Sequence, residues 1–211
     1  MPTSRSYADV CPIARALDVV GERWALLVVR ELLLGPQRFS DLRRALSGAS
    51  SNMLTDRLRE LEGHGVLRRR TLPPPAGSCV YELTERGREL EPVLDALGMW
   101  GRGEPPPANG SLSATSALLF MRSSARTRTN PPQLTYQVEL DNRVWTISSP
   151  HGRMQIEPGT PAAPDAGIQT DPRTLAALLL NPDGLDAAIA DGSVRADGKI
   201  SALRRLIRVA A

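Results

Sequence analysis

A proline- and glycine-rich segment near the middle of the chain constrains its fold most, because neither helical nor strand periodicity continues through it. Residues 102–111 read Arg-Gly-Glu-Pro-Pro-Pro-Ala-Asn-Gly-Ser, a composition typical of a linker. Consecutive prolines favour an extended, semi-stiff spacer. About 100 residues lie on each side, enough for a domain of ordinary size. The sequence therefore predicts two domains, residues 1–101 and 112–211, joined by a linker at 102–111.

The first half predicts helices, then a two-stranded hairpin, then a last helix. Apolar residues recur at helical spacing, and small polar residues stand where helix caps are expected. The expected elements are a helical stretch 14–34 kinked near Gly21, a short helix capped by Ser40 and ending at Leu46, a longer helix capped by Ser50, strands 66–71 and 79–83, and a helix opened by Thr84.

The second half mixes strands and helices. Asp141-Asn142 is a two-residue hairpin signal, and Asp171-Pro172 and Asn181-Pro182 each combine a capping residue with proline at the first turn. The expected elements are a helix at 113–122, strands 134–140, 144–148, 152–157, 167–170 and 192–196, helices opening at residues 171 and 181, and a last helix at 200–209. The predicted fold class is α+β, with a C-terminal α/β domain in which a small sheet packs on helices.

The segment from residue 39 to 63 has the form of a helix-turn-helix: a short helix, a tight turn and a longer helix. Leucines 54, 58 and 61 are expected to face the core, which leaves the opposite side of the longer helix free to enter a major groove. Residues in the first turns of such a helix reach base edges, and an asparagine can read adenine. Helix N-termini also favour phosphate. On this face we expect Ser51, Asn52, Thr55 and Arg59 to bind DNA, with Ser40 and Ser50 at the helix starts.

The hairpin that follows begins with three arginines, Arg68, Arg69 and Arg70. A wing placed directly after a recognition helix would bring their guanidinium groups beside the DNA backbone. Strand residues point alternately to opposite faces, however. The alternative for one of these arginines is therefore an ion pair with Glu60 or Glu62 instead of a DNA contact. A second alternative is that the whole unit is an ordinary three-helix bundle in which the serines are merely caps.

The first half also resembles a known family, on an ordered set of short blocks. The blocks are Cys11-Pro12-Ile13, Gly21-Glu22-Arg23-Trp24, Arg30-Glu31-Leu32, residues 35–42 (GPQRFSDL), residues 54–61 (LTDRLREL) and residues 80–87 (VYELTERG). Over about residues 7–101 the chain is similar to HxlR-type regulators. The resemblance implies a winged helix-turn-helix domain that binds an inverted repeat of double-stranded DNA as a homodimer, paired through the N-terminal segment and the last helix.

The last helix of this half agrees with such pairing, because its apolar face is too extensive for a solvated surface. The residues expected in the dimer contact are Leu90, Val93, Leu94, Leu97 and Trp100. Some members of the family sense oxidants through a cysteine at the place of Cys11, and a thiol near a helix N-terminus can be activated. The alternative is that Cys11 is a small buried packing residue.

The second half is weakly similar to sterol-carrier-protein-like domains, mainly over its last forty residues. That resemblance implies an apolar cavity between sheet and helices, lined by Phe120, Trp145, Ile147, Met154, Leu179 and Ile189. The alternative is that these six residues are ordinary core. If the cavity exists, the half could hold an apolar small-molecule effector.

Composition excludes several other classes of protein. With only two histidines, no nucleophile elbow and no phosphate-binding loop, the chain offers no catalytic constellation, so no enzyme activity is expected. Two distant cysteines predict neither a disulfide framework nor a metal site, and no cofactor is expected. No apolar run is long enough to span a membrane, and no leader sequence is evident, so a cytoplasmic location is expected.

The formal net charge of +3 is too small to indicate a polyanion partner by itself, so any DNA contact must come from a local patch. Taken together, these observations favour a dimeric transcription regulator that acts as a repressor. Its second domain would bind an effector. The remaining alternative is a carrier of lipids or other apolar ligands whose first half serves only for dimerisation.

Overall fold

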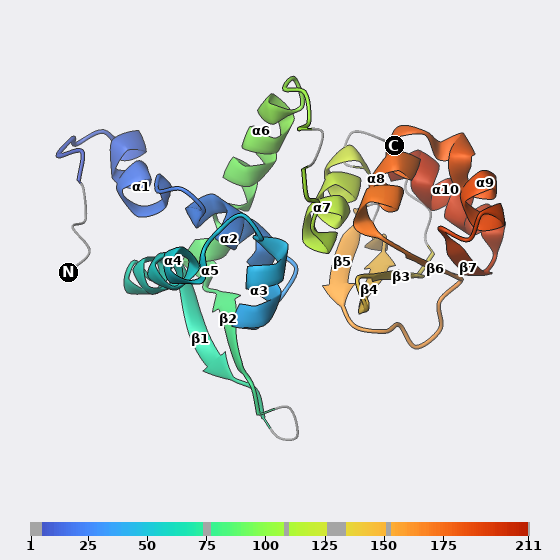
Figure 1. The fold of residues 1–211 in the computed structure, drawn as a ribbon, viewed down its shortest axis with the longest axis horizontal. Helices are drawn as coiled ribbons and strands as arrows, with labels where there is room; N and C mark the ends of the chain where they lie inside the picture. The colour runs from blue at the N-terminus through green and yellow to red at the C-terminus, as the bar shows by residue number, and fades with distance from the viewer. Residues whose placement is uncertain (1–5, 74–76, 108–109, 126–133, 151–152, 211) are drawn as a thin grey trace. The chain divides into compact units, whose positions relative to one another are not determined.

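The computed structural model of the chain describes residues 6–73, 77–107, 110–125, 134–150 and 153–210. The chain forms two compact units, Met1–Ser111 and Leu112–Ala211 (Figure 1). Each unit has its own secondary structure and its own core, so the two are described separately. Within the described residues, no helix is both long enough and apolar enough to cross a bilayer.

The first unit is helical apart from one hairpin. Its elements are α1 (Pro12–Val20), α2 (Ala25–Leu32), α3 (Phe39–Ala45), α4 (Ser51–Gly63), β1 (Leu67–Thr71), β2 (Cys79–Leu83), α5 (Glu85–Arg88) and α6 (Glu91–Gly101). β1 and β2 pair antiparallel, and Gln37 adds a single bridge to Tyr81 on the free edge of β2. A helix-turn-helix followed by a two-stranded wing is therefore present.

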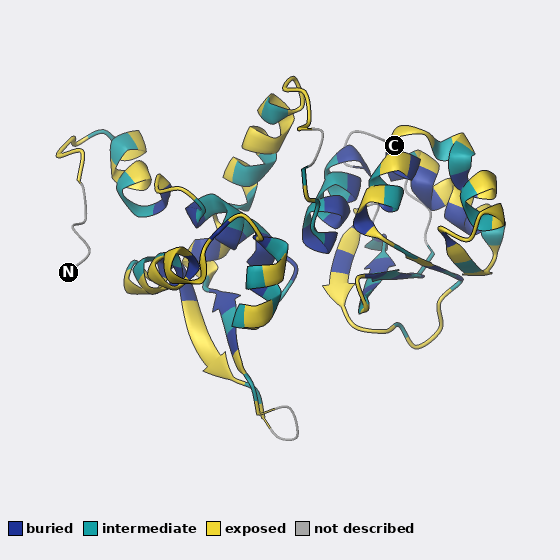
Figure 2. Ribbon diagram, viewed as in Figure 1, coloured by how far each residue is buried: buried dark blue, intermediate teal, exposed yellow. Residues whose placement is uncertain are grey.

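The core of this unit is built mainly from one face each of α2, α3 and α4. Buried residues of α2, α3 and α4 meet the root of the hairpin, where Leu67 and Leu83 pair in register. In Figure 2, α4 alternates between buried and exposed residues along its length, as an amphipathic surface helix should. The core thus fixes α4 by one side only.

Three sequence predictions for this unit were wrong. The kink expected near Gly21 is a complete break, with Trp24 in the left-handed region (φ 77°) directly before α2. Ser40 does not cap α3, because the N-cap is Arg38, two residues earlier, and the helix begins at Phe39. Thr84 does cap a helix, accepting a hydrogen bond from the N–H of Gly87, but that helix is the short α5, and α6 starts separately with Pro92 in its first turn.

The second unit is a five-stranded sheet with helices. Its elements are α7 (Ala114–Ala125), β3 (Tyr136–Leu140), β4 (Arg143–Ser148), β5 (Gln155–Pro158), β6 (Ala166–Thr170), α8 (Pro172–Leu180), the 3-10 turn η2 (Pro182–Gly184), α9 (Leu185–Ala190), β7 (Arg195–Gly198) and α10 (Ile200–Ala210). The strand order is β5-β4-β3-β6-β7, with only the β3–β6 pair parallel.

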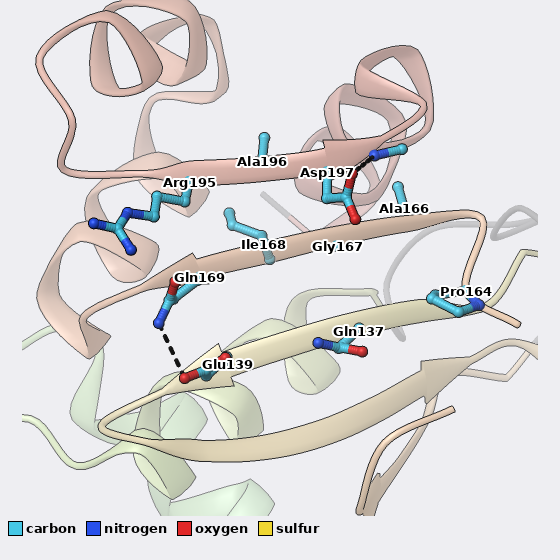
Figure 3. Close-up of a pocket in the computed structure, with 11 residues that line it drawn as sticks. Gln137, Glu139, Pro164, Ala166, Gly167, Ile168, Gln169, Arg195, Ala196 and Asp197 are labelled. Atoms are coloured by element: carbon cyan, nitrogen blue, oxygen red, sulfur yellow. Dashed lines mark hydrogen bonds between the residues drawn. The ribbon is translucent and has the colours of Figure 1, made fainter. Parts of the chain in front are cut away.

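The two faces of this sheet differ in character. One face is apolar and buried, and α7, α8 and α10 supply the other apolar residues of this core. The buried strand residues are Tyr136, Val138, Trp145, Ile147 and Ile168. The side chains that alternate with them lie on the other face and are mostly polar. On that face a hollow of about 200 Å³ lies over β6, where Gly167 has no side chain to fill it (Figure 3). The lining residues include Gln137, Glu139, Gly167, Gln169, Arg195 and Asp197.

Local predictions for the second unit were mostly confirmed, with two corrections. Asp141 and Asn142 both have positive φ (51° and 61°), the backbone of a tight primed hairpin turn. Asp171 caps α8 by accepting from the N–H groups of Arg173 and Thr174. Asn181, by contrast, makes no capping bond and is followed by a 3-10 turn, and the strand expected at 192–196 begins only at Arg195. Residue 152, where another strand was expected to begin, lies outside the described residues.

Candidate nucleic-acid interface

The start of α4 is held by its own N-cap. Ser50 has extended backbone angles, and its hydroxyl accepts a hydrogen bond from the N–H of Met53 at 3.2 Å, as predicted. Ala49, just before it, is buried in the turn between α3 and α4. The first turn of α4 is therefore fixed relative to the core on which a recognition helix would rest.

The two sides of α4 differ in burial as the sequence predicted. Leu54, Leu58 and Leu61 are buried with at most 2% of their surface exposed. The opposite side is exposed and polar (Figure 2). Its members are Ser51, Asn52, Thr55, Asp56 and Arg59.

The polar atoms of this exposed face differ in how far they are engaged. The hydroxyl of Thr55 donates a hydrogen bond to the carbonyl oxygen of Ser51 at 2.8 Å. The hydroxyl oxygen of Thr55 can still accept a hydrogen bond. Arg59 lies 3.4 Å from Asp56, an exposed pair that contributes little. Asn52 makes no hydrogen bond with the described residues, so both halves of its amide are free to meet a base edge. Asn52 is the freest polar group in the first turn.

One basic residue beside this face was missed by the sequence reasoning. Arg43 of α3 donates through Nε to the hydroxyl of Ser51 at 3.2 Å and through a terminal nitrogen to the carbonyl of Ser47 at 3.4 Å. It therefore places positive charge at the start of α4. Its contact with Ser51 joins two helices across the turn between them, which no local residue spacing predicts. Ser40 is exposed nearby, in the first turn of α3.

Two of the wing arginines pair with an acid of the hairpin itself, and their predicted contact with DNA stays a prediction. Arg68 and Arg70 lie on one face of β1 and both contact Glu82 of β2, with Nε–O distances of 2.7 and 3.0 Å. Arg69 faces the other way, over the ring of Tyr81 and 3.5 Å from the sulfur of Cys79. The sequence named the wrong acids as partners.

Those two acids of α4 are engaged elsewhere. Glu60 pairs with Arg57, and Glu62 accepts the backbone N–H of Arg69 rather than a guanidinium group. Two of the three wing arginines are therefore paired with an acid of the same unit. A surface built only to bind phosphates would not need that acid. The tip of the wing, residues 74–76, lies outside the described residues.

A second surface of this unit is apolar and exposed. Val93, Leu97 and Trp100 on α6 are exposed, whereas Leu90 and Leu94 are half-buried against the core of their own unit. The N-terminal segment adds further exposed apolar side chains, namely Tyr7, Val10, Ile13 and Leu17. Exposed apolar residues gathered in this number are typical of a protein–protein contact.

Cys11 is the N-cap of α1, and its backbone N–H is bonded to Asp9 at 2.9 Å. Its burial within the single chain is intermediate. Cys79 is exposed on the wing. Oxidant sensing by Cys11 stays a prediction.

The six residues expected to line an apolar cavity lie in the second unit, at different depths. Trp145, Ile147, Met154 and Leu179 are buried, and Phe120 and Ile189 are half-buried. None of them lines the hollow over Gly167 or the shallow one along the arginine-bearing side of α10. Their role stays a prediction.

Comparison with known proteins identifies the first unit. A family model described as HxlR-like helix-turn-helix matches residues 19–107. An uncharacterized HTH-type transcriptional regulator of Synechocystis sp., sll1512, is 44% identical over 92 residues, covering 44% of this chain and 68% of that protein. The chain belongs to the HxlR-like family.

This HxlR-like chain is also similar to other proteins. The uncharacterized HTH-type transcriptional regulator YvaP of Bacillus subtilis is 38% identical over 96 residues, covering 45% of this chain and 89% of that protein. Among solved structures, the oxidized form of redox regulator HypR is 34% identical, with a TM-score of 0.43 over 46% of this chain and all of that chain. The relatives are transcription regulators, and membership of a helix-turn-helix regulator family implies that this HxlR-like chain binds DNA.

Proposed function

We propose that the chain is a dimeric repressor that binds an inverted-repeat operator through α4. The observation that carries the proposal is the free, polar first turn of α4 above a fully buried leucine stripe. A helix held from one side, with its start fixed by Ser50, suits insertion into a major groove. In this proposal Asn52, Thr55 and Arg59 read the groove, while Ser40, Ser50 and Ser51 contact phosphates.

The exposed apolar residues of α6 and of the N-terminal segment support dimerisation. A second copy of the chain could cover both, because a two-fold contact pairs the same patch on each subunit. Trp100, Leu97 and Val93 would then be buried between copies, with Leu90 and Leu94 beneath them. Two copies of α4 related by the two-fold axis would meet half-sites about one helical turn apart.

Replacing Asn52 with alanine is expected to weaken binding to the preferred operator by about 1–3 kcal/mol while leaving binding to random duplex nearly unchanged. The reason is that a base contact carries sequence information, whereas phosphate contacts do not. Fluorescence anisotropy titrations against both duplexes at fixed salt measure the two affinities.

The matched control for this experiment is Asn181→Ala, which removes an exposed asparagine without a capping bond from the second unit. It should change neither affinity. Equal losses on operator and random duplex for Asn52→Ala would refute the assignment of Asn52 as a base reader.

We further propose that the second unit binds an effector with an apolar body and a hydrogen-bond acceptor. The hydroxyl of Tyr136 and the indole nitrogen of Trp145 are both buried on the inner face of the sheet, and neither has a hydrogen-bond partner among the residues that the structure describes. Burial raises the pKa of Tyr136 to about 12, so its hydroxyl keeps its proton at neutral pH. Buried donors of this kind usually have a partner, which a ligand oxygen could supply.

Decanoate and a planar aromatic ketone are suitable probes for this part of the proposal. Binding should shift the indole N–H resonance of Trp145, assigned with Trp145→Phe, and raise the melting temperature. If neither probe moves either signal, the effector class is wrong. A chain that binds the probes but shows no salt-dependent DNA affinity would favour the carrier alternative.

A further inference from the structure

The wing carries a compact charge cluster on one face, made of Arg68, Arg70 and Glu82. Arg68 stands opposite Glu82 in the β1–β2 register, and Arg70 follows two residues later on the same face. The carboxylate therefore lies between two guanidinium groups that the strand geometry brings to one side.

Glu82 contacts each arginine at the same kind of atom. One carboxylate oxygen accepts from Nε of Arg68 at 2.7 Å, and the other accepts from Nε of Arg70 at 3.0 Å. The terminal nitrogens of both arginines make no hydrogen bond with the described residues. The Arg68 and Arg70 side chains are 66% and 45% exposed, against 9% for Glu82. The acid is covered, and the donors left over face the solvent.

The carboxylate is ionised at neutral pH. Burial alone would favour its neutral form, but the hydrogen bonds and positive charges of Arg68 and Arg70 outweigh that effect and lower the pKa of Glu82. The cluster therefore offers DNA two phosphate-binding forks with a net charge of only about +1.

We propose that Glu82 is an internal counterion that limits the charge the wing presents to DNA phosphates and so restrains sequence-independent binding. The inference rests on the proposed function, because it requires the wing to lie near the DNA backbone. Non-specific affinity depends on the number of phosphates neutralised, with a slope of about −0.9 in log K against log salt for each one. A built-in acid beside two arginines cancels about one such charge.

A second effect opposes this one. By holding both guanidinium groups, Glu82 also reduces the conformational entropy that the two arginines lose on binding. The salt slope separates the two effects, because orientation changes affinity without changing the number of counterions released. The charge effect alone alters how strongly affinity depends on salt.

The test is Glu82→Gln, a substitution of nearly equal shape that removes the charge and keeps one acceptor. Relative to the wild type, the variant should bind random duplex more tightly, and its salt slope should be steeper by about 0.9. Its advantage should therefore shrink about 3.5-fold between 50 and 200 mM salt. Discrimination between operator and random duplex should fall. Glu82→Thr, whose side chain suits a strand, is scored in the same way if the glutamine variant does not fold.

The matched control is Glu89→Gln, which removes the same charge from the exposed end of α5, where the carboxylate pairs with no arginine of the described residues. It should leave the slope near that of the wild type. In the Arg68→Ala/Arg70→Ala background, Glu82→Gln should lose most of its effect.

The outcomes separate the inference from the function on which it rests. A wild-type protein without salt-dependent DNA affinity defeats the proposed function. If the wild type binds DNA but Glu82→Gln has an unchanged slope, or the same slope as Glu89→Gln, the counterion role is wrong. Weaker binding of Glu82→Gln at an unchanged slope would assign Glu82 to orienting the arginines instead, which also overturns the inference.

Discussion

Replacing Trp100 with glutamate is expected to make the protein monomeric and to lower its affinity for an inverted-repeat duplex by about 100-fold or more. Trp100 is 77% exposed in the single chain, so the change should cost the subunit's own fold little. A charge introduced into an apolar contact between copies, however, would be buried without a partner. Without the dimer, binding to the second half-site loses its high effective concentration. Sedimentation velocity and DNA titrations measure the two effects.

Leu180→Glu is the control for this substitution, because Leu180 is a similarly exposed residue (78%) of the second unit. It should leave both the oligomeric state and the DNA affinity as they are in the wild type. If Trp100→Glu stays dimeric, α6 is not the contact. If it becomes monomeric but keeps full operator affinity, the protein does not need two copies to bind.

Gly87→Ala is expected to destabilise the first unit by about 3 kcal/mol. A Cβ at this position would collide with the carbonyl oxygen of Val66, and backbone cannot move aside as the end of a side chain can. The carbonyl oxygens of Gly65 and Val66 also accept hydrogen bonds from the hydroxyl of Thr84. The clash therefore falls where the start of α5 packs against the root of the wing. Urea unfolding followed by circular dichroism measures the change.

Gly63→Ala provides the comparison for Gly87→Ala. Gly63 is the last residue of α4, and a Cβ there would meet no atom within 4 Å. Alanine should be neutral or stabilising by up to about 1 kcal/mol at a helical position. Similar stabilities for the two variants would show that the root of the wing is not tightly packed.

Local sequence patterns predicted those elements whose causes are themselves local. The leucine stripe of α4 follows from helical periodicity, and the Asp141-Asn142 turn follows from residues that tolerate positive φ. Ser40 failed as a cap because capping depends on where the first helical turn begins, and the extended Arg38 starts α3 earlier. A shift of two residues is within the ordinary uncertainty of helix ends.

The charge cluster on the wing could not be predicted, because it depends on strand register. Arg68 meets Glu82 only when the strands pair in the observed alignment, and a slip of one residue would turn the arginines to opposite faces. The loop between the strands contains three consecutive prolines, which match none of the short turns that set register. The acids of α4 that are nearest in sequence have other partners: Glu60 pairs with Arg57, and Glu62 accepts the backbone N–H of Arg69.

The most direct test of DNA reading by α4 is selection of binding sites from a pool of random duplexes, using the full chain and Asn52→Ala in parallel. We predict that the wild type enriches an inverted repeat with half-site centres about 10 base pairs apart or a multiple of that spacing. The variant should lose preference at one symmetric pair of positions. Enrichment of the same sequence by both proteins, or of none by the wild type, would contradict the account.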